Sequence, residues 1–355
     1  MSKPYLYLAG LRKLAKKLKG TEKIHLGIRP YGFHAGNSLA LVVYPFLLCK
    51  EMRKLGKEPR FRFFISINDF EQDELDGPDF RKYPFNIYPK NTSLKFTPDE
   101  RHCCPSIVDH WTPIIEKIVG SLYRLYPGIK INFVRNSSIK DNKYFRDVLL
   151  DTIKDPQAQA DIFRKYSNKD VLDSPLRYAG AVCPDCKSTH GRTTVLPRQR
   201  IKWECAKCAC CVEMPYSFFD YWWYHKPMLA SRIKIFGIDV AMSGADHYNE
   251  DDFIVRKKFL KKYFKNLKEP VMLFCPMLIA LDGQKMSKSR NNTCFAKIRD
   301  LIKIAESTEA GDIALTKDMV EKVTNEVEYA SVDHISDSST VSNIETLPVL
   351  TKVSK

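Results

Sequence analysis

The sequence predicts an α/β protein built on a mainly parallel sheet. Three short apolar runs, Lys23–Ile28, Arg62–Ile67 and Val271–Cys275, have the length and composition of buried strands. Helical patterns over residues 38–54 and 251–267 each precede one of the later runs. Strands that alternate with helices imply parallel pairing with crossover connections.

The chain opens with a basic segment, in which the first 20 residues carry six Lys or Arg and no acidic residue. A transit peptide has such a composition, but Leu8, Leu11, Ala15 and Leu18 share one helical face. The pattern therefore favours an amphipathic helix. Helices are also expected later in the chain, over residues 144–154, 158–166 and 317–327, with a break at Asp155-Pro156 between the first two.

Composition indicates a globular protein of more than one compact unit, with 355 residues, 44% hydrophobic and 28% charged. No stretch approaches the roughly 18 apolar residues of a membrane helix. We therefore expect a cytoplasmic location and no membrane partner. Residues 301–355 carry five Lys and ten Asp or Glu, so residues 1–300 carry +15 − (−5) = +20. A basic body suits ATP or RNA, although lysine-rich surfaces also serve solubility.

Four parts are expected along the chain. Residues 1–75 form the first half of a catalytic domain, and residues 76–215 form an inserted helical module that ends in a cysteine-bearing segment at about 181–215. Residues 216–305 return to the strand and helix pattern. Residues 306–355 are acidic and rich in Ser and Thr, and we expect them to be partly disordered.

Two Cys-x-x-Cys pairs, Cys183/Cys186 and Cys205/Cys208, stand 18 residues apart. Four thiolates on two tight turns suit tetrahedral zinc, and this spacing is typical of a zinc ribbon. A site with four protein ligands is structural. Cys210 and Cys211 are alternative choices for the fourth ligand. Cys103 and Cys104 have no second pair, and we interpret them as structural cysteines.

The first strand runs through a glycine-bearing turn into a helix, with His34, Gly36 and Asn37 at the junction. Free backbone amides and the helix dipole favour an anion there, and the two polar side chains add donors. The alternative is a buried histidine in an ordinary turn. We expect Ser38 to be the N-cap of this helix and Leu55-Gly56 its end.

A second phosphate-binding element is the loop Lys285-Met286-Ser287-Lys288-Ser289. Two ammonium groups three residues apart suit a mobile clamp for a polyphosphate. Between the two elements, Ser243-Gly244-Ala245-Asp246-His247 follows an apolar run, and an Asp at a strand end suits the hydroxyl groups of a ribose.

These three elements, in this order, resemble the signatures of class I aminoacyl-tRNA synthetases, and the pentapeptide at 285–289 is a full match. The closest resemblance is to the catalytic region of class I lysyl-tRNA synthetases, over roughly residues 5–300, without their C-terminal anticodon-binding region. The resemblance implies a Rossmann-like catalytic domain that activates an amino acid with ATP and Mg²⁺ and transfers it to a tRNA acceptor stem. Lysine is the amino acid it favours. Arg29 and Asn68 depart from the family pattern near the amino-acid pocket.

The resemblance also implies roles for individual residues. His34 and Asn37 would stabilise charge on the phosphoryl oxygens, and Lys285 and Lys288 would hold the departing pyrophosphate. The other residues expected to contact ATP are Gly36, Gly244, Asp246, His247, Met286, Ser287 and Ser289.

On the amino-acid side we expect Arg29, Asp69, Trp222 and His225 to contact substrate. Asp69 follows a strand and suits a substrate ammonium group, although a solvated loop explains it equally well. Core packing is the alternative for the aromatic cluster that contains Trp222. Two other functions stay open: activation for a minimal or non-tRNA acceptor, and a non-catalytic RNA-binding protein with a synthetase fold.

Overall fold

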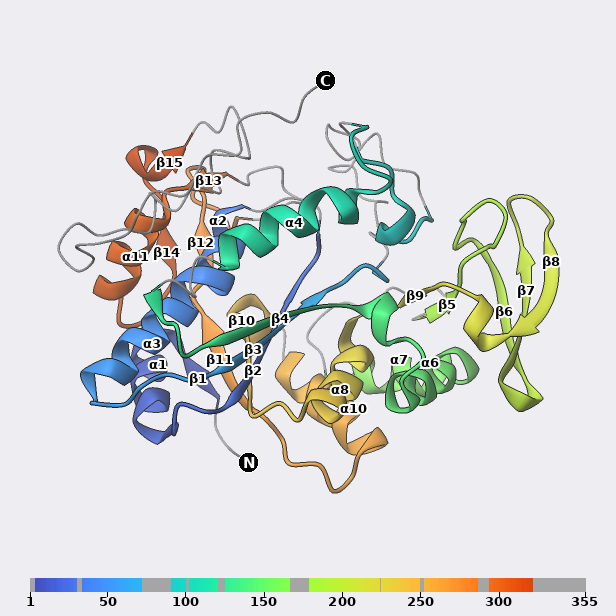
Figure 1. Cartoon of the computed structure of the whole chain (residues 1–355), viewed down its shortest axis with the longest axis horizontal. Coiled ribbons are helices and arrows are strands. Elements are labelled where there is room, and N and C mark those ends of the chain that lie inside the picture. The colour runs from blue at the N-terminus through green and yellow to red at the C-terminus, as the bar shows by residue number, and fades with distance from the viewer. Residues whose placement is uncertain are drawn as a thin grey trace.

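The computed structural model describes residues 4–30, 34–71, 91–99, 102–120, 125–166, 179–223, 225–249, 252–286 and 294–321. Among these residues, six parallel strands form a central sheet in the order β1-β11-β10-β2-β3-β4 (Figure 1). The predicted parallel α/β fold is confirmed. The strands are β1 (Tyr5–Leu6), β2 (Lys23–Ile28), β3 (Arg62–Ile67), β4 (Lys130–Arg135), β10 (Val240–Gly244) and β11 (Val271–Cys275).

The strand order reverses beside β2. From β2 the chain moves outward to β3 and β4, and it later returns to the other side of β2 as β10 and β11. Open parallel sheets bind ligands at the carboxyl ends of the strands that flank such a point. The carboxyl ends of β2 and β10 are therefore where a nucleotide site is expected.

Side chains alternate across the sheet and bury both of its faces. Phe63 and Ile65 belong to the large core that includes residues of the helices on one face. Those helices are α1 (Tyr7–Lys17), α3 (Tyr44–Lys54), α4 (Ile107–Gly120) and α11 (Ile298–Ser307). Phe64 points to the opposite face, where its ring stacks on Phe236 with centroids 4.8 Å apart. That face is covered by α7 (Pro156–Tyr166), α8 (His225–Phe236) and α10 (Asp252–Tyr263).

The helix after β2 begins earlier than Ser38, so the prediction of Ser38 as N-cap was wrong. Its first turn, α2 (Ala35–Ser38), continues through the π-helical turn η1 (Leu39–Val43) into α3. His34 is the cap, because its Nδ1 accepts from the amide of Gly36 at 3.1 Å. The end at Leu55-Gly56 is confirmed, and Gly56 has φ +70°.

The region expected to be an insertion contains part of the central sheet. β4 lies within residues 76–215 and pairs with β3 along its whole length. Helix α6 (Lys143–Lys154) ends at Asp155, and α7 begins at Pro156, so the predicted break is confirmed. Two further sheets follow at one end of the molecule (Figure 1). They consist of β5 (Ala179–Ala181) with β9 (Tyr221–Trp223), and β6 (Gly191–Leu196), β7 (Arg200–Cys205) and β8 (Cys211–Pro215).

Short elements lie between these. They are η4 (Leu94–Phe96), η5 (Asn136–Ile139), η6 (Pro197–Gln199), η7 (Tyr216–Phe218) and α9 (Asp246–Asn249).

The folded body continues beyond residue 305. β12 (Leu278–Ile279) pairs with β14 (Ile313–Ala314), and β13 (Phe295–Ala296) pairs with β15 (Val320–Glu321). Ile313 and Met319 are buried in the main core. The helix expected over residues 317–327 is wrong for its first part, which forms the 3₁₀ turn η9 (Lys317–Met319) and then β15. The remainder lies outside the described residues.

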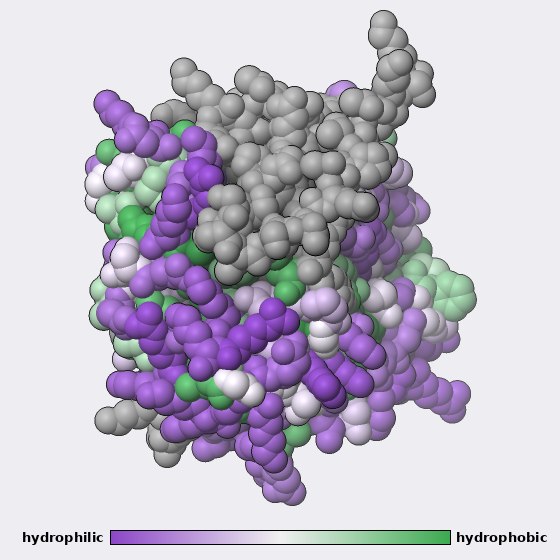
Figure 2. All heavy atoms as spheres, turned by 60° about the vertical axis from the view of Figure 1, so that its left-hand side comes forward, coloured by the Kyte–Doolittle hydropathy of each residue, from purple (hydrophilic) through white to green (hydrophobic). Residues whose placement is uncertain are grey.

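The outer side of α1, α3 and α11 is mainly hydrophilic, with small scattered apolar patches (Figure 2). Within the described part of the chain, no helix combines the length and apolar character needed to cross a membrane.

Candidate active site

His34, Gly36 and Asn37 form a polar surface at the N-terminus of α2. An imidazole that accepts a hydrogen bond at Nδ1 carries its proton on Nε2, so His34 offers Nε2 as a donor. His34, Gly36 and Asn37 are all partly exposed there. The helix N-terminus and these side chains together favour an anionic ligand.

The beginning of the lysine-serine loop lies beside this polar surface. Residues 278–286 form a tight hairpin, in which the amide of Met286 donates to Leu278 O at 2.8 Å. A Cβ atom added at Gly36 would lie 3.4 Å from the Cε methyl of Met286. Beyond the loop, Cys294 O accepts from the amide of Ala35 at 2.9 Å. Two motifs some 250 residues apart in the sequence are therefore in contact.

Asp246, shortly after β10, pairs with the lysine-serine loop. Its Oδ2 lies 3.1 Å from Nζ of Lys285. Burial alone would raise the pKa of Asp246, but its electrostatic interactions and hydrogen bonds with His247 and Lys285 outweigh burial and hold the pKa below its usual value. Asp246 is thus an anionic acceptor, suited to ribose hydroxyl groups, beside a lysine that can exchange it for a phosphate.

A second polar cluster lies at the carboxyl end of β3. Asp69 is buried and accepts from both the amide and the Oγ of Ser137. Glu71, also buried, forms an ion pair with Arg29, which follows β2. Arg232 of α8 is 2% exposed and donates to Asn68 Oδ1 at 2.7 Å.

The charges of this cluster are close to balance. Burial raises the pKa of Asp69, while its hydrogen bonds from Ser137 and the charges of Lys95 and Arg135 oppose that shift. Burial lowers the pKa of Arg232 to about 10, and the nearby carboxylates of Glu71 and Asp69 oppose it. Such a concentration of buried, shifted groups is typical of a functional site.

A comparison with models of protein families identifies the family of this chain. The chain matches the family model described as tRNA synthetases class I (K) over residues 10–328. The chain belongs to the class I tRNA synthetases. A comparison with curated proteins found no match.

Solved structures similar to this synthetase include tyrosyl- and arginyl-tRNA synthetases. A tyrosyl-tRNA synthetase from Archaeoglobus fulgidus, complexed with L-tyrosine, has 16% identity and a TM-score of 0.39, with 81% of this chain and 64% of that chain covered. The enzyme from Aeropyrum pernix has 15% identity and a TM-score of 0.41, with 84% and 66% covered. A putative arginyl-tRNA synthetase from Campylobacter jejuni has 13% identity and a TM-score of 0.35, with 86% and 70% covered. The chain therefore spans slightly less than two thirds of the two tyrosyl enzymes.

Several predicted site residues of the synthetase lie outside these two clusters or outside the described residues. Ser287, Lys288 and Ser289 are not among the described residues. His225 begins α8, but its side chain is not described. The indole of Trp222 lies over Gly180 of β5, where an added Cβ atom would be 2.8 Å from Nε1.

Three residues of the second cluster were not expected at the site. Arg232 comes from the middle of α8, which also carries Lys226 and Lys234, and Ser137 comes from a turn after β4. Glu71 was visible only as one of several acidic residues after β3. The sequence held no signal that set Arg232 apart from the other basic residues of α8.

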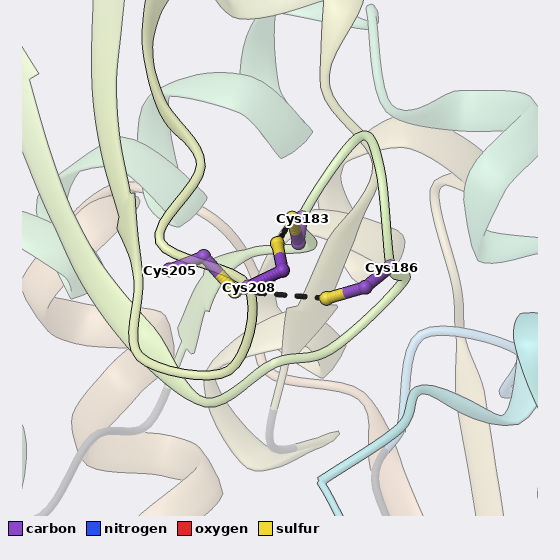
Figure 3. Close-up of side chains that lie close together, drawn as sticks. All are labelled: Cys183, Cys186, Cys205 and Cys208. Atoms are coloured by element: carbon purple, nitrogen blue, oxygen red, sulfur yellow. Dashed lines mark hydrogen bonds between the residues drawn. The ribbon is translucent and has the colours of Figure 1, made fainter.

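The four predicted metal ligands of the synthetase converge at the base of the β6-β7-β8 sheet (Figure 3). The Sγ atoms of Cys183 and Cys208 are 3.6 Å apart, as are those of Cys186 and Cys205. All four Sγ atoms lie within 4.8 Å of one another. Tetrahedral zinc with Zn–S bonds of about 2.3 Å places its sulfur atoms about 3.8 Å apart, so this donor set fits zinc.

Gly244 offers a direct test of the Asp246 position. A Cβ atom at residue 244 would lie 2.5 Å from Asp246 Oδ1. Gly244→Ala should therefore displace the carboxylate and raise the KM for ATP by roughly tenfold, the cost of about one hydrogen bond to a charged group. The KM for the amino acid should stay unchanged. Gly283→Ala is a poor control because Gly283 has φ +75°, whereas a Cβ atom at Gly120 would meet no atom of the described residues within 4 Å, so Gly120→Ala is the control. An unchanged ATP KM in Gly244→Ala would contradict this role.

Proposed function

We propose that the chain activates an amino acid with ATP, forming an aminoacyl-adenylate and pyrophosphate, and then transfers the aminoacyl group to a tRNA. The observation that carries this proposal is the contact of Gly36 with Met286 beside the Lys285–Asp246 pair. These groups meet at the carboxyl ends of β2 and β10, where the strand order reverses.

The substrate carboxylate would attack the α-phosphorus of ATP, with pyrophosphate leaving in line. In this proposal His34, Asn37 and the amides at the start of α2 would stabilise charge on the phosphoryl oxygens, and Lys285 would hold the leaving group. Mg²⁺, when bound with ATP, supplies neutralising charge at the phosphates. The contribution of the protein is positioning and electrostatic stabilisation, without a covalent enzyme intermediate.

The decisive experiment is amino-acid-dependent exchange of pyrophosphate into ATP, run with each of the twenty amino acids. Exchange that depends on one amino acid supports the proposal and identifies the substrate. If no amino acid supports exchange while tRNA still binds, the chain is an RNA-binding protein with a synthetase fold.

Within this proposal, lysine is the amino acid that the second cluster favours. A buried lysine ammonium needs a carboxylate, and Asp69 and Glu71 are both buried at the end of β3. Arg29 would repel an ammonium group if it were uncompensated, but it forms an ion pair with Glu71. Arg232 is the opposing charge, and its Nη2 donates to the Oδ1 atoms of Asn68 and Asn136.

Asp69→Asn tests the lysine assignment. The amide keeps an oxygen for the hydroxyl of Ser137 but removes the negative charge, so the KM for lysine should rise about 10- to 100-fold, equivalent to about 1.5–3 kcal/mol. The KM for ATP should not change, and the exposed Asp147→Asn serves as the matched control.

The pH dependence of the KM for lysine provides a second test of Asp69. Burial raises the pKa of Asp69, so the parent loses the negative charge as pH falls, already at a pH above the usual range of an Asp. The KM for lysine should therefore rise on acidification in the parent and not in D69N. Strong exchange with a neutral amino acid and none with lysine would remove the lysine assignment and leave the activation chemistry intact.

A further inference from the structure

Arg232 of α8 joins the carboxyl ends of two neighbouring strands. Its side chain is buried, and its Nη2 donates to Asn68 Oδ1 at 2.7 Å and also to Asn136 Oδ1. Asn68 directly follows β3, and Asn136 directly follows β4. One nitrogen atom of a helix residue therefore holds the ends of both strands.

The two asparagines stand next to the Asp69–Ser137 pair. Asn68 precedes Asp69, and Asn136 precedes Ser137. The amide and the Oγ of Ser137 both donate to the carboxylate of Asp69. The contacts of Arg232 and of Asp69 therefore bridge the same two strand ends at consecutive positions, and a shift of either asparagine would move one member of the Asp69–Ser137 pair.

Stability of the fold is a poor explanation for a guanidinium at this place. Among the described residues, Arg232 Nε and Asn136 Nδ2 are buried and have no hydrogen-bond partner. Burial of a charge is costly, and an unsatisfied buried donor adds to that cost, so an apolar side chain of similar size is often at least as stable. A buried cation that is retained under these conditions points to a functional role.

The charge of Arg232 interacts with the buried carboxylates of Asp69 and Glu71, since both oppose the lowering of the Arg232 pKa by burial. The interaction is mutual, so Arg232 favours the ionised form of Asp69, whose pKa burial raises. The other charged or titratable groups of this region lie on β2, η4, β4 and α10 and after β2, and they are His25, Lys95, Arg135, Arg256 and Arg29. Burial and the two arginines of α8 and α10 hold the pKa of His25 well below its usual value, so His25 adds no charge.

We propose that Arg232 is a positioning and specificity-determining residue of the amino-acid subsite, which holds Asp69 against Ser137 and keeps its carboxylate ionised. The subsite then selects a cationic side chain over a neutral one of the same length. This role rests on the proposed function, in which Asp69 meets the ammonium group of lysine. Arg232 acts through Asn68 and Asn136 and through its charge, without a step in the chemistry.

Discrimination between lysine and norleucine tests the role, because norleucine is lysine without its ε-amino group. In Arg232→Gln, the KM for lysine in pyrophosphate exchange should rise about 10- to 100-fold. The inhibition constant of norleucine in the same assay should stay at the parent value. Arg232→Lys keeps the charge and should restore most of the preference, and Arg164→Gln, which removes an exposed arginine of α7, should behave as the parent.

The pH profile separates the charge of Arg232 from its packing. The KM for lysine should rise on acidification in the parent, and in Arg232→Gln this rise should begin at a higher pH, because loss of a nearby cation raises the pKa of Asp69 further. The double variant Arg232→Gln/Asp69→Asn should show no such rise. A guanidinium that only packs would leave the profile of Arg232→Gln at the position of the parent.

Unfolding in urea gives a readout that does not depend on activity. The losses of unfolding midpoint in Arg232→Gln and Asp69→Asn should be less than additive in the double variant, since the two charges interact. Arg164→Gln combined with Asp69→Asn is the additive control. If Arg232→Gln does not fold, Asn136→Ala removes one acceptor of Arg232 and keeps every charge. It should raise the KM for lysine more than the inhibition constant of norleucine.

Three results would overturn the role of Arg232 while exchange with lysine by the parent still supports the proposed function. They are equal weakening of lysine and norleucine in the variants, additive losses of midpoint, and a lower KM for lysine in Arg232→Gln, which would show that repulsion of the substrate ammonium prevails. No exchange by the parent with any amino acid would instead remove the proposed function, and the specificity role of Arg232 with it.

Discussion

Replacing Lys288 by alanine should lower the rate of amino-acid activation at saturating ATP by roughly 10²-fold or more, the scale of losing one preorganised donor. The reason is that negative charge grows on the pyrophosphate as it leaves, so a lysine that follows it stabilises the transition state more than bound ATP. Lys285→Ala should have a smaller effect on rate and also raise the KM for ATP, because Lys285 already pairs with Asp246. Pre-steady-state measurement of adenylate formation separates the two.

The matched control is Lys303→Ala, which removes an exposed lysine of α11. The rate of activation and the KM for ATP should both stay at the parent level there. If Lys288→Ala changes only the KM for ATP, the lysine binds ground state and transition state equally and the assignment to the leaving group is wrong.

The central sheet was predictable because its strands are locally encoded. Lys23–Ile28, Arg62–Ile67 and Val271–Cys275 are buried apolar runs bounded by polar or turn residues, and the observed strands have the same bounds. β1 was missed because two residues carry no periodicity, and its pairing with β11 is decided by tertiary contacts. β4 was missed as a sheet strand because it is mostly half-buried and mixed in polarity, as an edge strand can be.

The start of the helix after β2 shows how a side chain overrides a propensity argument. Ser38 is a favourable N-cap residue, but His34 caps the helix one turn earlier. Pro45 has no amide to donate, and the amide of Tyr44 bonds to Leu39 O, five residues back, in the π-helical turn. The sequence signals for a helix were right, and the competition between two caps was decided by the turn geometry.

The two elements that we expect to bind phosphate were recognisable in the sequence for the same local reason, since each is a short motif. The second cluster was only partly predictable, because its hydrogen bonds join distant residues: Arg232 reaches Asn68 across 164 positions. No pattern within either segment encodes that contact.

The ribbon itself carries the second large expected effect. Cys186→Ser or Cys208→Ser should remove the metal of the Cys183–Cys208 group and unfold the β6-β7-β8 sheet, since the binding free energy of such sites, on the order of 10 kcal/mol, is folding free energy. Two of the four cysteines, Cys183 and Cys205, are buried beside Ile201 and Trp203 of that sheet, in a core shared with α6, β5 and β9. Protease cleavage within residues 183–215, together with loss of one zinc, is the expected result.

Cys211→Ser is the matched control, because Cys211 is exposed on β8 and outside the group of four. It should keep both the zinc and the protease resistance of the parent. If the parent and Cys186→Ser have the same metal content, the four thiols are not metal ligands.

The effect of the ribbon should also reach the amino-acid side of the active site. β5 and β9 continue the module, and the amide of Trp223 donates to the carbonyl of Phe70, the residue between Asp69 and Glu71, at 2.8 Å. Lys95 forms a further ion pair across this junction with Asp220 at 2.6 Å. The approach of Met286 to Gly36 and the ion pair of Lys285 with Asp246 are made by residues outside the module. Partial loss of the ribbon fold in Cys208→Ser should therefore raise the KM for the amino acid more than the KM for ATP, and equal changes in both would show that the module supports the whole catalytic domain.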